Sequence, residues 1–260
     1  WYQMVLGFNE SYYYWMDEGF TNYAAERVMN HLRSKGLIPG DPDPRPFESF
    51  YNGYIDLVMS GVEEPLSTHA DHFEDAGAYG AAAYQKGALF LYQLEYVIGK
   101  PAFDQGLLDF FNTWKFKHPD DNDFIRVMEK SSGLELDWYR DYMVYSLKTV
   151  DYSVDTVFAY QEQSAIILER IRDMPMPIDV VINTKAGTQL YYTIPLDIMR
   201  GAKEERGPDD KPYELLHDWN WVNPSYLFVV PFTPDQIQSV TIDPYMRMLD
   251  LDRENNVWAY

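Results

Sequence analysis

An acidic pair opens the stretch Asp17-Glu18-Gly19-Phe20, which lies among large aromatic side chains on a predicted helix. A carboxylate in apolar surroundings is tolerated when it has an ionic partner, when it is protonated, or when it binds a metal ion. A simpler alternative is a helix acid held by the partial positive charge of the helix's N-terminal half. Glu18 is therefore a candidate metal ligand, with an ordinary structural role as its alternative.

Two histidines, His69 and His72, form a second candidate for metal chemistry in an acidic segment that ends at Asp75. Neutral imidazoles and carboxylates suit zinc, and this spacing can place both rings on one side of a helical turn. An acidic loop with ordinary hydrogen bonds is the favoured alternative, because the nearby Gly77 weakens the helix. The segment leads directly to Tyr84, and Tyr79 lies five residues before it, so we predict that His69, His72 and Tyr79 line a substrate cleft.

The elements that must position these residues differ between the two halves of the chain. Apolar residues at three- and four-residue steps predict helices over residues 10–35, 49–58, 81–98, 101–114, 122–131 and 136–146. After residue 150, short β-branched and aromatic runs predict strands over 154–160, 165–171, 178–183, 189–194, 227–231 and 239–243. The sequence thus predicts an α+β protein, with a helical domain over 1–150 and a small β-sandwich over 151–260.

The composition excludes several classes of function. Forty-one acidic against 21 basic residues give a formal charge of -20, which disfavours nucleic acid as a partner. No apolar run approaches the roughly 20 residues that a membrane-spanning helix needs. The chain has no cysteine, so neither disulfides nor thiolate chemistry contribute.

Glu18 with Gly19-Phe20-Thr21 resembles the second half of a zinc signature, in which a helical HExxH is completed by a glutamate on the next helix. This signature belongs to the M1 aminopeptidases, zinc peptidases of the gluzincin group. Asp17 departs from the Asn that is usual there, which affects a hydrogen bond but not the ligand. Counting back the family's spacing from Glu18 places the second histidine just before Trp1, and Trp1-Tyr2 fits the aromatic pair that follows it. We therefore expect the chain to be a piece of a larger protein.

A second motif, Tyr84-Gln85-Lys86-Gly87, is similar to the Tyr-x-Lys-Gly segment that heads a helix in the same family. There the tyrosine hydroxyl donates a hydrogen bond to the oxyanion that forms when zinc-bound water attacks the scissile carbonyl. The resemblance assigns this catalytic role to Tyr84. Its alternative is a core tyrosine, one of 22 in the chain. The family's helical pattern continues to about residue 146.

The resemblance implies a zinc-dependent aminopeptidase that acts on peptide N-termini. It also implies that residues 1–150 are the helical C-terminal part of a gluzincin catalytic domain. Because the HExxH histidines and general base are expected upstream, we expect zinc in the complete protein but neither zinc nor hydrolysis in this chain alone. The closing segment, residues 242–256, resembles the tail of bacterial members, and an exported or periplasmic location is favoured.

Two other classes of function stay open. One is a non-enzymatic exported module that binds glycans or peptides, with Trp219, Trp221 and Tyr226 as a stacking platform. The other is a related zinc hydrolase, such as an endopeptidase or an epoxide hydrolase.

Overall fold

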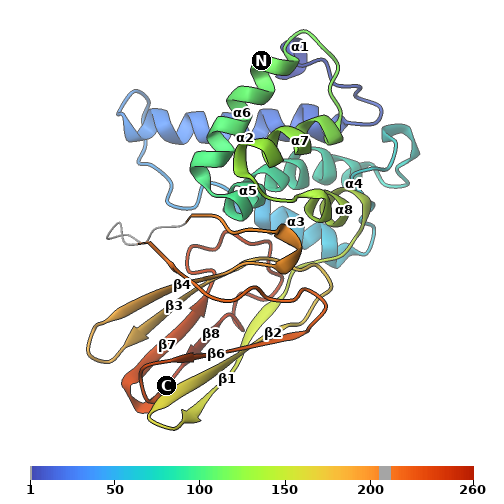
Figure 1. Ribbon diagram of the computed structural model, residues 1–260. Helices are drawn as coiled ribbons and strands as arrows, with labels where there is room; N and C mark the ends of the chain where they lie inside the picture. The colour runs from blue at the N-terminus through green and yellow to red at the C-terminus, as the bar shows by residue number, and fades with distance from the viewer. Residues whose placement is uncertain (1, 205–211) are drawn as a thin grey trace. The chain divides into compact units, whose positions relative to one another are not determined.

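The computed structural model describes residues 2–204 and 212–260, which form two compact units (Figure 1). The first contains most residues up to Leu147, and the second contains Lys148–Tyr260 with the short segments Val97–Gly99 and Gly133–Glu135. Helices followed by two sheets confirm the predicted α+β class. Trp1 of the expected aromatic pair lies outside the described residues. The functional domain boundaries at 150 and 151 stay a prediction.

The first unit is built from helices, and each helix predicted from apolar spacing is present with its ends shifted by a few residues. None of the described helices has the length and apolar composition that a membrane crossing needs. Their bounds are α1 Tyr2–Val5, α2 Tyr14–Ser34, α3 Glu48–Ser60, η1 Ala70–His72, α4 Ala76–Gly80, η2 Ala81–Lys86, α5 Gly87–Ile98, α6 Lys100–Trp114, α7 Asp121–Ser132 and α8 Asp137–Tyr145.

Aromatic rings join these helices into one core. Phe124 of α7 lies between Phe20 of α2 and Phe110 of α6, with ring centroids 4.8 and 5.0 Å away. Trp15 of α2 meets Phe90 of α5 at 4.9 Å. All five side chains are at most 1% exposed. Large aromatic surfaces bury much apolar area, so these contacts hold α2, which carries Glu18, against α5.

The helix predicted over 81–98 is not uniform. Residues Ala81–Lys86 form a π-helix, η2, in which the Gly87 N–H donates to the Ala82 carbonyl, and only Gly87–Ile98 is α-helical. A π-turn holds one more residue than an α-turn and rotates the side chains around it. Apolar spacing cannot distinguish the two over so short a stretch. The wide turn carries Tyr84.

The second unit is a β-sandwich of two sheets (Figure 1). One sheet has the order β1-β2-β6 and the other the order β5-β4-β3-β7-β8. Tyr192 of β4 and Phe228 of β6 pack across the sandwich, with centroids 5.7 Å apart. The strands are β1 Tyr152–Tyr160, β2 Gln163–Arg170, β3 Ile178–Thr184, β4 Gln189–Ile194, β5 Glu214–Leu215, β6 Ser225–Val230, β7 Ile237–Ile242 and β8 Val257–Ala259.

Trp219, the first member of the suggested glycan platform, belongs to the core of this unit. It is 2% exposed, and its indole N–H donates to the Asn223 carbonyl at 3.0 Å. Its ring meets the buried Tyr152 edge-on at 5.5 Å. A platform for sugars needs an exposed ring face. The burial of Trp219 therefore removes one of the three rings proposed for that platform.

A buried carboxylate, Asp250, joins the start of β1 to the C-terminal segment. Its two oxygens accept the Tyr152 and Asp252 backbone N–H groups, each at 3.0 Å. The residue is fully buried, and burial raises the pKa of Asp250 to about 7, with a further contribution from the charge of Asp151. Asp250 is thus a structural acceptor whose charge is costly in the folded protein.

The raised pKa predicts how stability changes with pH. Folded Asp250 holds its proton more tightly than the unfolded chain does. Its contribution to the free energy of unfolding is therefore complete below about pH 4 and is lost as the pH rises to about 7. Over that range the free energy of unfolding falls by at most about 1.4 kcal/mol per pH unit because of Asp250. Urea unfolding at pH 5 and pH 8 should therefore show a smaller pH dependence for Asp250→Asn than for the wild type. An equal dependence in both proteins would contradict this role.

Candidate active site

Glu18 sits in the N-terminal half of α2, next to an unusually buried acid. Glu18 itself is half-buried, while Asp17 is only 4% exposed. The first turn of a helix presents unpaired N–H groups and a partial positive charge, which stabilises carboxylates there. Asp17 lies in the first turn of α2 and Glu18 follows it directly, while Trp15, Met16 and Phe20 of the same helix are buried in the aromatic core.

Tyr84 lies beside Glu18 in space, although the two belong to separate helices. The Tyr84 hydroxyl donates a hydrogen bond to the Glu18 carboxylate. This bond, followed by burial and the negative charges of Glu18 and Asp17, raises the pKa of Tyr84 to about 12. The hydroxyl consequently keeps its proton throughout the physiological pH range. With 41% of the residue exposed, it is an accessible hydrogen-bond donor next to a carboxylate.

Tyr79 lies in the same neighbourhood, at the end of α4. Burial raises its pKa first, and the negative charge of Glu18 is the next cause. Its ring packs on Tyr14 at 5.0 Å and on Phe73 at 5.5 Å, which holds the half-buried side chain in place. The structure therefore brings Tyr79, Tyr84 and Glu18 together. The role of Tyr79 in substrate contact stays a prediction.

His69 and His72 lie around the short helix η1 and make local contacts. The His69 ring nitrogen Nδ1 accepts the Asp71 N–H at 3.2 Å, and the two imidazole rings are 4.8 Å apart. Tyr12 meets His69 edge-on, also at 4.8 Å. In residues 2–204 and 212–260 no three His, Asp or Glu side chains are grouped so that they could share a metal ion. The rival metal centre is thus not formed, and substrate contact by either histidine stays a prediction.

The absence of a group of three metal-ligating side chains in the described residues also concerns Glu18 as a zinc ligand. A carboxylate is a suitable zinc ligand, but a catalytic zinc site takes three protein ligands. The described residues supply Glu18 and no complete set. A zinc ion held by Glu18 would therefore need further ligands besides those that the described residues group around it.

A buried ion pair supports the helix that carries Tyr84. Lys86 Nζ lies 2.7 Å from a Glu63 carboxylate oxygen, and the two side chains are 4% and 7% exposed. The sequence placed Lys86 in the Tyr84 motif but offered no partner for it. Glu63 begins a polar, acidic segment, so it could be expected to pair with some basic residue. Its spacing in the sequence does not indicate that this residue is Lys86.

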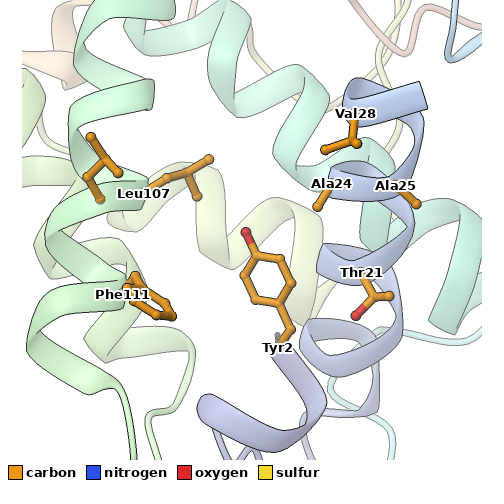
Figure 2. A pocket seen from close by; sticks show the side chains of 8 residues that line it. Tyr2, Thr21, Ala24, Ala25, Val28, Leu107 and Phe111 are labelled. Atoms are coloured by element: carbon orange, nitrogen blue, oxygen red, sulfur yellow. The ribbon is translucent and has the colours of Figure 1, made fainter. Parts of the chain in front are cut away.

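An apolar groove of about 640 Å³ lies between α1, α2 and α6 (Figure 2). Figure 2 shows the Tyr2 ring between the α2 side chains and those of α6. None of the lining side chains is charged, so the groove differs in chemistry from the region of Glu18 and Tyr84. Its lining residues are Tyr2, Thr21, Ala24, Ala25, Val28, Leu107, Leu108 and Phe111.

The family model described as "Peptidase family M1 domain" matches residues 9–143, more than half of the 260 residues. The chain belongs to peptidase family M1. The matched range includes Glu18, Tyr84 and all the helices of the first unit from α2 to the greater part of α8. The M1 resemblance drawn from the two motifs is therefore confirmed.

Individual relatives match a similar part of the chain. A leukotriene A-4 hydrolase homolog of Botryotinia fuckeliana is 26% identical over 124 residues, covering 43% of this chain and 17% of that protein. Leucine aminopeptidase 2 of Aspergillus clavatus is 31% identical over 119 residues, covering 43% and 18%. The chain thus matches less than a fifth of the length of these curated M1 relatives.

A solved structure resembles both units. Aminopeptidase A of Legionella pneumophila, in complex with aspartic acid, aligns with a TM-score of 0.54 and 14% identity. The alignment covers 92% of this chain and 24% of that chain. At this identity the likeness concerns the fold alone, and it extends beyond the range of the M1 family match into the β-sandwich.

Proposed function

We propose that this chain contributes to the active site of a zinc-dependent aminopeptidase, with Glu18 as a metal ligand and Tyr84 as the donor to the reaction's oxyanion. The observation that carries the proposal is the hydrogen bond between Tyr84 and Glu18. Two motifs that were separate in the sequence meet at their chemical groups. Membership of the M1 family supports the same assignment.

Tyr84 suits this role because of its proton and its exposure. Attack on a peptide carbonyl converts the carbonyl oxygen into an oxyanion, and a positioned donor lowers the energy of that state. A tyrosine with a pKa of about 12 remains a donor at every pH at which a peptidase works. Zinc, when bound, would polarise the carbonyl and supply an activated water.

Tyr79 and the two histidines take a subsidiary place in the proposal. Tyr79, fixed by Tyr14 and close to Glu18, would form one wall of the peptide cleft. His69 and His72 would contact the substrate further along the same segment. Peptides with a free N-terminus are the proposed substrates.

Zinc content and turnover test the proposal directly. The 260 residues contain no HExxH, so we expect the chain alone to bind no stoichiometric zinc and to release no N-terminal residues from peptides. The protein that includes an HExxH segment should hold one zinc and show turnover, and Glu18→Ala should abolish both. Glu26→Ala, an acid further along α2, is the matched control. Full zinc content in Glu18→Ala would refute the ligand assignment.

A second candidate is a zinc hydrolase that opens epoxides. It is favoured by one observation, the similarity to a protein named as a leukotriene A-4 hydrolase homolog. Peptide and epoxide substrates offered to the same zinc-loaded protein distinguish the two candidates. Turnover of the epoxide without release of amino acids would replace the aminopeptidase proposal.

A further inference from the structure

Two glycines bring the backbones of α2 and the Tyr84 segment into direct contact. A Cβ atom on Gly19 would lie 2.4 Å from the Gly87 carbonyl carbon, 2.5 Å from its Cα and 2.8 Å from the Ala88 nitrogen. Cβ atoms essentially never come so close to other atoms. Only a residue without a side chain can occupy Gly19 while the two segments stay at this separation.

The contact is reciprocal. A Cβ atom on Gly87 would lie 2.7 Å from the Trp15 carbonyl oxygen and 3.1 Å from the Gly19 Cα. The clashing atoms all belong to backbone, so no rotation of a side chain would relieve them. Trp15 is fully buried in the aromatic core, which limits how far α2 can retreat.

This crossing lies beside the chemical groups of the candidate site. Gly19 follows Glu18 directly, and Gly87 directly follows the π-helix that carries Tyr84. We propose that the Gly19–Gly87 contact and the π-helix η2 together position the Tyr84 hydroxyl on Glu18. Gly19 and Gly87 are thus positioning residues, and their catalytic importance rests on the proposed function.

The π-helix is the second element that positions Tyr84. Its extra residue rotates Tyr84 relative to Gly87, while Lys86 in the same turn is held by its ion pair with Glu63. The backbone contact sets the distance between the two helices, and the wide turn sets the direction of the hydroxyl. Removing either element should separate Tyr84 from Glu18.

The hydrogen bond can be followed in this chain without any catalytic assay. The ring Cζ of Tyr84, labelled with ¹³C and assigned with Tyr84→Phe, reports the state of the hydroxyl at neutral pH. Glu18→Ala removes the carboxylate that accepts this hydrogen bond, so its Tyr84 Cζ signal is the reference for a hydroxyl that has lost its acceptor. Gly87→Ala should move the Tyr84 signal towards that reference. Gly80→Ala is the matched control, since Gly80 is helical and a Cβ there meets nothing within 4 Å.

A second variant tests the π-helix. Deleting Ala81 should convert the wide turn into an α-turn, leave both glycines in place and again move the Tyr84 signal. An unchanged signal in folded Gly87→Ala and in the folded deletion variant would overturn the proposal. If both variants fail to fold, the contact is a requirement for folding, and the positioning role is likewise overturned.

Kinetics of the zinc-loaded protein separate this inference from the proposed function. Gly87→Ala should lower kcat about 10²-fold with little change in KM, because small misplacements of a reacting group cost that much. Full activity in Tyr84→Phe would refute the catalytic role of Tyr84, whatever the glycine variants do. A shifted Tyr84 signal in Gly87→Ala would still support the positioning geometry in that case.

Discussion

Tyr84→Phe in the zinc-loaded protein should lower kcat by about 10² to 10³-fold, the usual effect of losing one donor to an oxyanion. KM for the peptide should change little, because the hydroxyl acts on the transition state rather than on the bound substrate. The hydroxyl is accessible, keeps its proton to a pKa of about 12 and lies next to Glu18. Steady-state kinetics with a chromogenic amino-acid amide measure both constants.

The control for Tyr84→Phe removes an equivalent hydroxyl elsewhere. Tyr160 in β1 is 49% exposed, close to the 41% of Tyr84, and belongs to the second unit. Tyr160→Phe should leave kcat and KM unchanged. Equal kcat for Tyr84→Phe and the wild type, with zinc content intact, would show that Tyr84 is not the oxyanion donor.

Glu63→Ala should lower the free energy of unfolding by about 3 to 5 kcal/mol, the largest stability effect that we expect from the first unit. The substitution leaves the Lys86 ammonium buried without its carboxylate, since both side chains are less than 8% exposed. Isolated charges in such surroundings are costly because neither water nor an opposite charge compensates for their lost hydration. Urea unfolding monitored by circular dichroism gives the value.

Two controls show whether the cost comes from the stranded charge. Adding Lys86→Met to Glu63→Ala should restore most of the lost stability, because the uncompensated charge is gone. Asp104→Ala breaks the exposed ion pair with Lys100, whose side chains are about half exposed, and should cost less than about 1 kcal/mol. A similar small loss in Glu63→Ala would contradict the importance of burial.

Much of the fold follows from local patterns in the sequence. Apolar spacing located α2, α3 and α6 to α8, and alternation located six strands of the sandwich. β5 and β8 escaped detection because strands of two and three residues are too short to show alternation. Glu18 and Tyr84 could be named because each belongs to a motif with several specified residue types.

The geometry of the candidate site required the tertiary structure. Nothing local distinguishes the π-helix from the α-helix predicted over Ala81–Lys86, because a run of three alanines has no apolar spacing that favours either turn. The contact between Gly19 and Gly87 depends on how α2 packs, and a glycine in a helix gives no indication of what approaches it. The pairing of Lys86 with Glu63 depends on the same packing.

The backbone contact between Gly19 and Gly87 also limits how this site can change over evolutionary time. A clash between side chains can be relieved by shrinking the partner, so two positions can drift together through compensating substitutions. Here every clashing partner is a main-chain atom, which no substitution can shrink. We therefore expect the Glu18 and Tyr84 motifs to be inherited as one unit, each glycine retained for as long as the other helix lies against it.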